Sequence, residues 1–94
     1  MAGMVLRIED VPEGSEMTFM LIGRISSPEV QALKARIAET AKPVVLDLQQ
    51  VRLVDLDAAR YLAAAERRGI ELRHLPPYVR EWVVLERKRL GDLE

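Results

Sequence analysis

The chain contains no cysteine and a single histidine, His74, among its 94 residues. The absence of cysteine excludes disulfide bonds, thiolate nucleophiles and metal or cluster sites with thiolate ligands. One histidine is too few for a metal site built from several imidazoles of one chain. The sequence therefore predicts no metal site and no cofactor.

The chain also lacks an excess of charge of either sign and any long apolar run. Lysine and arginine number 14 against 15 acidic residues, which leaves a formal net charge of −1. A basic excess typical of nucleic-acid or anionic-membrane partners is absent. No apolar run approaches the roughly 18 residues of a membrane-spanning helix, and residues 1–11 do not read as a secretory signal. We expect a cytoplasmic protein with one domain, residues 1–94, no nucleic-acid partner and no membrane insertion.

Two short strands are predicted at the start of the chain. The first, around residues 5–8, is expected to end before Asp10, and a turn is expected at residues 12–14. The second strand covers residues 17–22 and is expected to be broken by Gly23. Because only a short turn separates them, the two strands are predicted to pair antiparallel.

A helix start follows at Ser26-Ser27-Pro28-Glu29. A serine can cap the first turn, Pro28 suits that turn, and Glu29 is favoured at the positive end of the helix dipole. Apolar residues at helical spacing continue to position 41, and Lys42-Pro43 is expected to end the helix. For both serines we favour this helix-start role over partner contact or phosphate acceptance.

The second half of the chain alternates between strands and helices. Residues 44–48 are almost continuously apolar, so this strand is predicted to lie at the sheet centre, covered on both faces. A helix over 58–68, an edge strand over 70–75 and a last helix from position 76 follow. The fold class is therefore α/β, in the order β-β-α-β-α-β-α, with a mixed, mostly parallel sheet of about four strands and three helices.

A polar turn joins the central strand to the next helix at residues 54–58, Val-Asp-Leu-Asp-Ala. With this turn, with Gly23 after the second strand and with Val-Val-Leu-Asp-Leu at 44–48, the chain resembles a STAS domain, the family of sulfate-transporter tails and anti-sigma-factor antagonists. In such antagonists the turn usually reads Asp-Ser-Ser-Gly, and a partner kinase phosphorylates the second serine. Asp57 occupies that phosphoacceptor position here, and it offers no hydroxyl to a serine kinase.

The resemblance implies a non-catalytic protein–protein interaction module of the anti-sigma-factor-antagonist type, not switched by serine phosphorylation at the usual site. The residues that it places at the partner surface are Asp55, Leu56, Asp57, Ala58, Ala59, Arg24, Ser26 and Ser27. The partner implied is an anti-sigma-type kinase. Alternatives are an accessory STAS subunit of a membrane transport complex, with a transporter subunit as partner, a homodimer, and a weak nucleotide-binding protein. For the nucleotide-binding alternative, the chain lacks a phosphate-binding glycine motif.

Individual residues carry competing interpretations. Asp57 is read first as a helix N-cap and second as a fixed negative charge, an incomplete mimic of phosphoserine, while Asp55 is a cap or turn former. Asp47, inside an apolar strand, is expected to have hydrogen-bond partners. Tyr78 and Trp82 are expected in the core, because their exposure would instead indicate a protein partner.

Overall fold

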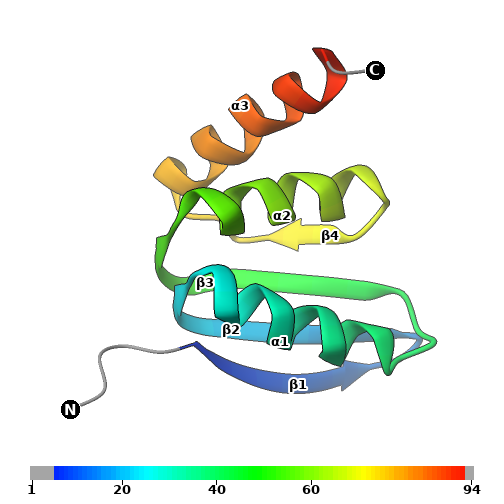
Figure 1. Cartoon of the computed structure of the whole chain (residues 1–94). Helices are drawn as coiled ribbons and strands as arrows, with labels where there is room; N and C mark the ends of the chain where they lie inside the picture. Colours follow the sequence, from blue (N-terminus) through cyan, green and yellow to red (C-terminus); the bar gives the residue numbers. More distant parts are fainter. Residues whose placement is uncertain (1–5, 93–94) are drawn as a thin grey trace.

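A computed structural model of the chain describes residues 6–92 and has the predicted element order (Figure 1). Its elements are β1 (Arg7–Glu13), β2 (Glu16–Ile25), α1 (Ser27–Ala38), β3 (Val44–Val54), α2 (Leu56–Arg67), β4 (Glu71–Arg73) and α3 (Pro77–Asp92). The sheet order is β1-β2-β3-β4, with an antiparallel β1/β2 pair and parallel β2/β3 and β3/β4 pairs. The predicted α/β class, the mixed sheet and the antiparallel first pair are confirmed.

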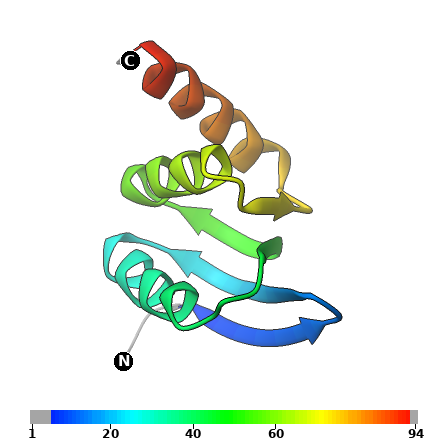
Figure 2. The same ribbon diagram turned by 90° about the vertical axis from the view of Figure 1, so that its right-hand side faces the viewer.

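Helices α1 and α2 lie on the same face of the sheet, and α3 packs beside α2 past the β4 edge (Figures 1 and 2). We call the helix-bearing side the covered face and the other the open face. The prediction that residues 44–48 lie at the sheet centre and are covered on both faces is confirmed, because β3 is an inner strand and Val45, Leu46, Asp47 and Leu48 are all buried. Helices cover only one of the two faces within residues 6–92.

The apolar core fills the space between the covered face and the helices. Phe19 and Leu21 from β2 and Leu46 from β3 meet Leu33 of α1 and Leu62 of α2, all at most 2% exposed. Burial of a side chain of this size stabilises the fold by about 1.5–3 kcal/mol relative to exposure. Further core residues come from α3, so this helix is anchored to the domain as well.

The first hairpin is longer and tighter than predicted. β1 continues past Asp10 and through Pro12, and the chain reverses at Gly14-Ser15, where Gly14 has a φ of +58°. A proline is tolerated in β1 because β1 is an edge strand. Glycine takes positive φ without strain, which suits a two-residue turn. Val5, expected in this strand, lies outside the described residues.

Gly23 does not end β2. It lies within the strand at a φ of 108°, next to a shift of the register with β3, and β2 continues to Ile25. Glycine is the residue that accepts such an irregularity in a strand. Because of this extension, Ile25 pairs with Val54, so β2 and β3 end together.

Helix and strand limits differ from the predictions by a few residues. α1 ends at Ala38, before the expected position 41, and α2 begins at Leu56, before the expected position 58. The last strand is at the edge as predicted but covers only Glu71–Arg73, because His74 adopts a φ of +59° and leaves the sheet. Among the helices of residues 6–92, none combines the length and apolar character of a membrane span.

Candidate functional site

Two strand-to-helix turns lie side by side at one edge of the sheet. Since β2 and β3 are parallel, both deliver their carboxyl ends there, and α1 and α2 begin immediately afterwards (Figure 1). The backbone N–H of Asp55 donates to the carbonyl of Ile25 at 3.1 Å and joins the two turns directly. The expected proximity of the 23–27 loop to the 55–59 turn is confirmed.

Asp55 is the N-cap of α2 and connects it to α1. One carboxylate oxygen, Oδ1, accepts from the backbone N–H of Ala58 at 2.8 Å, and Oδ2 accepts from the N–H of Ser27 at 3.1 Å. Each helix start leaves backbone donors without an intrahelical partner, and this carboxylate satisfies one in each helix. The interpretation of Asp57 as the cap is wrong, because the helix begins two residues earlier than expected.

Asp57 lies in the exposed first turn of α2 and makes no hydrogen bond or ion pair with any residue from 6 to 92. Its charge is favoured there by the helix dipole, by about 0.3–1 kcal/mol. Leu56, beside it, is also exposed. The turn therefore presents an acid and an apolar side chain to solvent, with the structural task left to Asp55.

The 24–27 segment supplies a cap and two exposed side chains. Ser26 is the N-cap residue of α1, and both its backbone N–H, at 3.0 Å, and its hydroxyl donate to the Glu29 carboxylate. This confirms the helix-start role of Ser26, and Ser27 opens the helix with its N–H bound to Asp55. Arg24 is exposed on β2, two residues before Ser26. Arg24 and Ser27 are thus accessible to a partner.

Ala58 and Ala59 contribute no surface to this site. Both side chains are fully buried beneath the first turn of α2. We therefore leave them out of the contact surface, which we define as Arg24, Ser27, Leu56 and Asp57 and call the turn surface.

A groove of about 340 Å³ runs from this surface between α1 and α2. Its lining comprises Ser27, Val30, Gln31, Lys34, Asp57, Arg60, Tyr61, Ala64 and Arg68. Asp57 is the one acid in this lining, against three cationic side chains. The Lys34 ammonium lies 5.6 Å from the centre of the Tyr61 ring, a cation–π geometry. Burial raises the pKa of the Tyr61 hydroxyl above its ordinary value, and the Arg68 charge lowers it in part.

Tyr78 and Trp82 are exposed, so the prediction that they pack in the core is wrong. α3 instead turns Val79 and Val83 toward the core. The Tyr78 hydroxyl donates to the backbone carbonyl of Arg52, which places this tyrosine beside the end of β3. The half-exposed Tyr78 ring thus lies near the end of β3, the strand that leads into the turn surface.

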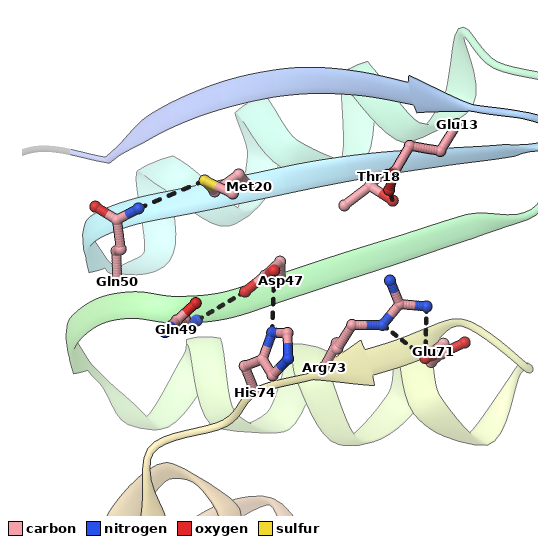
Figure 3. A network of polar contacts seen from close by, with 9 residues as sticks. All are labelled: Glu13, Thr18, Met20, Asp47, Gln49, Gln50, Glu71, Arg73 and His74. Atoms are coloured by element: carbon pink, nitrogen blue, oxygen red, sulfur yellow. Dashed lines mark hydrogen bonds and ion pairs between the residues drawn. The ribbon is translucent and has the colours of Figure 1, made fainter.

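The open face carries a polar network (Figure 3). Buried Asp47 accepts from the backbone N–H of Gln49 at 3.0 Å, and its other oxygen lies 3.1 Å from Nδ1 of His74. The expectation that Asp47 has hydrogen-bond partners is confirmed. Among residues 6–92, no group of three or more potential metal ligands gathers here or elsewhere.

No protein-family model and no curated protein matches the sequence. The solved structures that are similar include the following two. The first, Mglu, is 24% identical with a TM-score of 0.58, and the match covers 69% of this chain and 18% of that one. The second is an uncharacterized DUF3478-family protein with a SpoIIAA-like fold from Shewanella loihica PV-4, 15% identical with a TM-score of 0.43, covering 71% of this chain and 57% of that one.

These similarities concern the fold alone. The likeness to Mglu, below 25% identity, shows a shared arrangement of elements in a small part of that longer chain. The α/β fold of this chain, with its mixed four-stranded sheet in residues 6–92, is shown by its own element order and strand pairing.

Proposed function

We propose that this chain is a protein–protein interaction module of the anti-sigma-factor-antagonist type that works in the cytoplasm. The observation that supports the proposal is that two neighbouring acids, Asp55 and Asp57, have different roles. Asp55 caps α2 and binds Ser27, whereas Asp57, at the position that is phosphorylated in the antagonists it resembles, is exposed and has no structural partner among residues 6–92. A charge without a structural task at that position is available to a partner.

The mechanism is surface complementarity. Leu56 supplies an apolar contact, Asp57 a constant negative charge, and Arg24 a flanking positive charge. The core of a protein interface is typically apolar and its rim polar, and this small surface has both components. One carboxylate carries about one negative charge against 1.5 to 2 for phosphate, so the module has a fixed and intermediate charge state. Binding is therefore not switched by serine phosphorylation at position 57.

The first experiment is an affinity pull-down from the native lysate, read by mass spectrometry, with tagged wild type and with Leu56→Glu. We expect an anti-sigma-type kinase in the wild-type sample and its loss with the variant. Glu39→Lys, a charge change just after the far end of α1 at an exposed position, is the matched control and should retain the partner. Recovery of no such protein, or equal recovery with Leu56→Glu, would count against the proposal.

Once a partner is identified, its affinities for wild type, Asp57→Ser and Asp57→Ala test whether the negative charge of Asp57 contributes to binding. Serine and alanine both remove the carboxylate, and neither disturbs the cap at Asp55. We expect both variants to change the affinity by the same several-fold factor. Equal affinity in all three proteins would refute a role for the charge.

A second candidate, an accessory subunit of a membrane transport complex, is favoured by the exposure of Tyr78 and Trp82 on α3. An aromatic last helix that touches another subunit is what this function requires. In that case the pull-down recovers transporter subunits, Trp82→Ala loses them, and Asp57→Ala retains them. Retention with Trp82→Ala would exclude this contact.

A candidate of another class, weak nucleotide binding, is favoured by the three cations around Tyr61 in the α1/α2 groove. Thermal-shift measurements with ATP and GTP test it, because a ligand that binds only the folded state raises the melting temperature. Absence of stabilisation by either nucleotide would remove this candidate.

A further inference from the structure

The outer side of α3 carries a row of large side chains. Tyr78 and Trp82 are each 41% exposed and Leu85 is 61% exposed. With Arg89 they are spaced four, three and four residues apart, so they lie along one side of the helix with the spacing of the a and d positions of a coiled coil. We call these four residues the outer row.

The outer row lies on a flank of α3, about a quarter turn from the side that faces the domain. Val79 and Val83, fully buried, and Glu86, almost fully buried, are the residues of α3 that face inward, and at 3.6 residues per turn they lie about 100° around the helix from the outer row. α3 lies at one end of the molecule and packs against α2 (Figures 1 and 2). Of the outer row, Tyr78 also donates a hydrogen bond to the backbone carbonyl of Arg52. A contiguous row of exposed aromatic and aliphatic side chains marks an interaction surface.

Two charges flank the outer row on the same side of the helix. Glu81 and Lys88 are seven residues apart, both exposed, and neither forms an ion pair with any residue from 6 to 92. Other charges of α3 are engaged within the domain. Arg80 and Arg87 both bind Glu66 of α2. Glu81 and Lys88 are thus opposite charges left available to a partner.

We propose that the outer row binds a second copy of this chain, with the two α3 helices antiparallel about a twofold axis. In this arrangement Trp82 meets the partner's Leu85, and Leu85 meets the partner's Trp82. Tyr78 then meets the partner's Arg89 at each end, a cation–π pair. Glu81 comes within one turn of the partner's Lys88, so the twofold axis generates two ion pairs at the flank.

Charge decides in favour of the antiparallel arrangement. Parallel helices in register would place Arg89 against the partner's Arg89, a like-charge contact, and would leave Glu81 and Lys88 without an opposite charge from the partner. The antiparallel arrangement replaces the like-charge contact by an aromatic one and pairs Glu81 with Lys88. The surface is therefore complementary to itself, which is the property that a twofold dimer requires.

The dimer is expected to be weak. The outer row spans Tyr78 to Arg89, about 18 Å at 1.5 Å per residue. An interface of this length falls at the small end of specific interfaces, whose usual lower limit is about 1,200 Å² of buried surface. We expect a concentration-dependent monomer–dimer equilibrium over roughly the micromolar range.

Sedimentation velocity of the full chain at several concentrations tests the association. Wild type should rise from the mass of one chain toward twice that mass. Leu85→Glu should stay monomeric throughout, and it should fold normally because Leu85 is largely exposed. Val84→Glu is the matched control, on the same helix and 42% exposed but outside the outer row, and should dimerise as wild type does. A monomeric wild type up to roughly millimolar concentration, or equal dissociation by both variants, would overturn the proposal.

Charge exchange tests the antiparallel arrangement. Glu81→Lys places like charges against the partner's Lys88 and should weaken the dimer about tenfold or more, whereas Glu81→Lys combined with Lys88→Glu should restore it. A Glu81→Lys dimer as strong as wild type, or stronger, would refute the arrangement. Asp57→Ala should leave dimerisation unchanged, so this result is independent of the proposed function. The chain has one tryptophan, so Trp82 fluorescence follows the same equilibrium.

Discussion

The two faces of the sheet are built from the same strands but are sealed in different ways. On the covered face, Phe19 and Leu46 are buried in the apolar core, and the Arg36 guanidinium lies 5.9 Å from the centre of the Phe19 ring. On the open face, Thr18, Val45 and Asp47 are also buried, although no helix of residues 6–92 lies over them. There Thr18 and Asp47 have side-chain partners, Glu13 and His74 (Figure 3).

The two faces therefore tolerate different kinds of side chain. The covered face excludes water, so a polar group there would lack a partner. The open face accepts an acid at 7% exposure because Gln49 and His74 lie within hydrogen-bond distance of it. In the described part of the chain, no buried side-chain nitrogen or oxygen is left without a partner. Substitutions on the two faces should therefore lower the stability of the fold for different reasons.

The largest effect is expected on the covered face. Leu46→Ala removes a fully buried side chain and leaves a cavity, which should lower the free energy of unfolding by about 2–5 kcal/mol. Ile22→Ala on the open face removes a half-buried side chain and should cost roughly 1 kcal/mol. Urea unfolding of both variants provides the measurement. Equal losses would mean that the open face is packed as tightly as the covered one.

The next effect concerns the hydrogen bonds of the open face. Asp47→Ala leaves the N–H of Gln49 without its acceptor and should cost about 1–3 kcal/mol. His74→Ala should cost less, because Asp47 keeps the bond from Gln49 and His74 is exposed. Denaturant unfolding of the two single variants and the double variant separates the terms. A larger loss with His74→Ala than with Asp47→Ala would contradict this account.

A smaller effect is expected where the helices of the covered face begin. Asp55→Ala removes acceptors for Ala58 and Ser27 and should cost about 1 kcal/mol, within a range of about 0.5–2 kcal/mol. Asp57→Ala removes only a favourable interaction with the helix dipole and should change stability by about 0.5 kcal/mol or less. Thermal unfolding compares the two. The reverse order would show that Asp57, not Asp55, secures the helix.

The smallest effect is a loss of stability at alkaline pH, caused by Tyr61 in the groove between α1 and α2. Burial raises the pKa of Tyr61 in the folded chain, so the unfolded chain loses this proton first. The contribution to stability is therefore complete below about pH 10 and decreases as the pH rises through the higher folded value. Unfolding measured at about pH 9 and about pH 11 should show a smaller decrease for Tyr61→Phe than for wild type. An identical decrease would assign the loss to other groups.

Local chemistry made some of this structure predictable. The Ser26 and Glu29 pairing starts α1 as expected, since its partners lie within one turn of each other. The short connection between β1 and β2 likewise implied their antiparallel pairing. The extension of β1 through Pro12 was missed, because an edge strand tolerates residues that a central strand excludes.

The orientation of α3 was not predictable in the same way. Apolar residues occupy positions 78, 79 and 82–85, which leaves more than one side of the helix suited to the core. Packing against α2 buries Val79 and Val83 and exposes Tyr78 and Trp82. A similar limit applied to β3, since an apolar run predicts burial on both faces but does not tell on which face a helix lies.

The sequence by itself determined the order of the elements, the α/β class and the position of a polar turn at a helix start, because periodicity and turn chemistry act between residues close along the chain. Only the tertiary structure decided that Asp55 caps α2 and leaves Asp57 exposed, and that α3 turns its aromatic side outward. Both outcomes depend on groups distant in sequence: Ser27, 28 residues from Asp55, and the surface of α2 beneath α3.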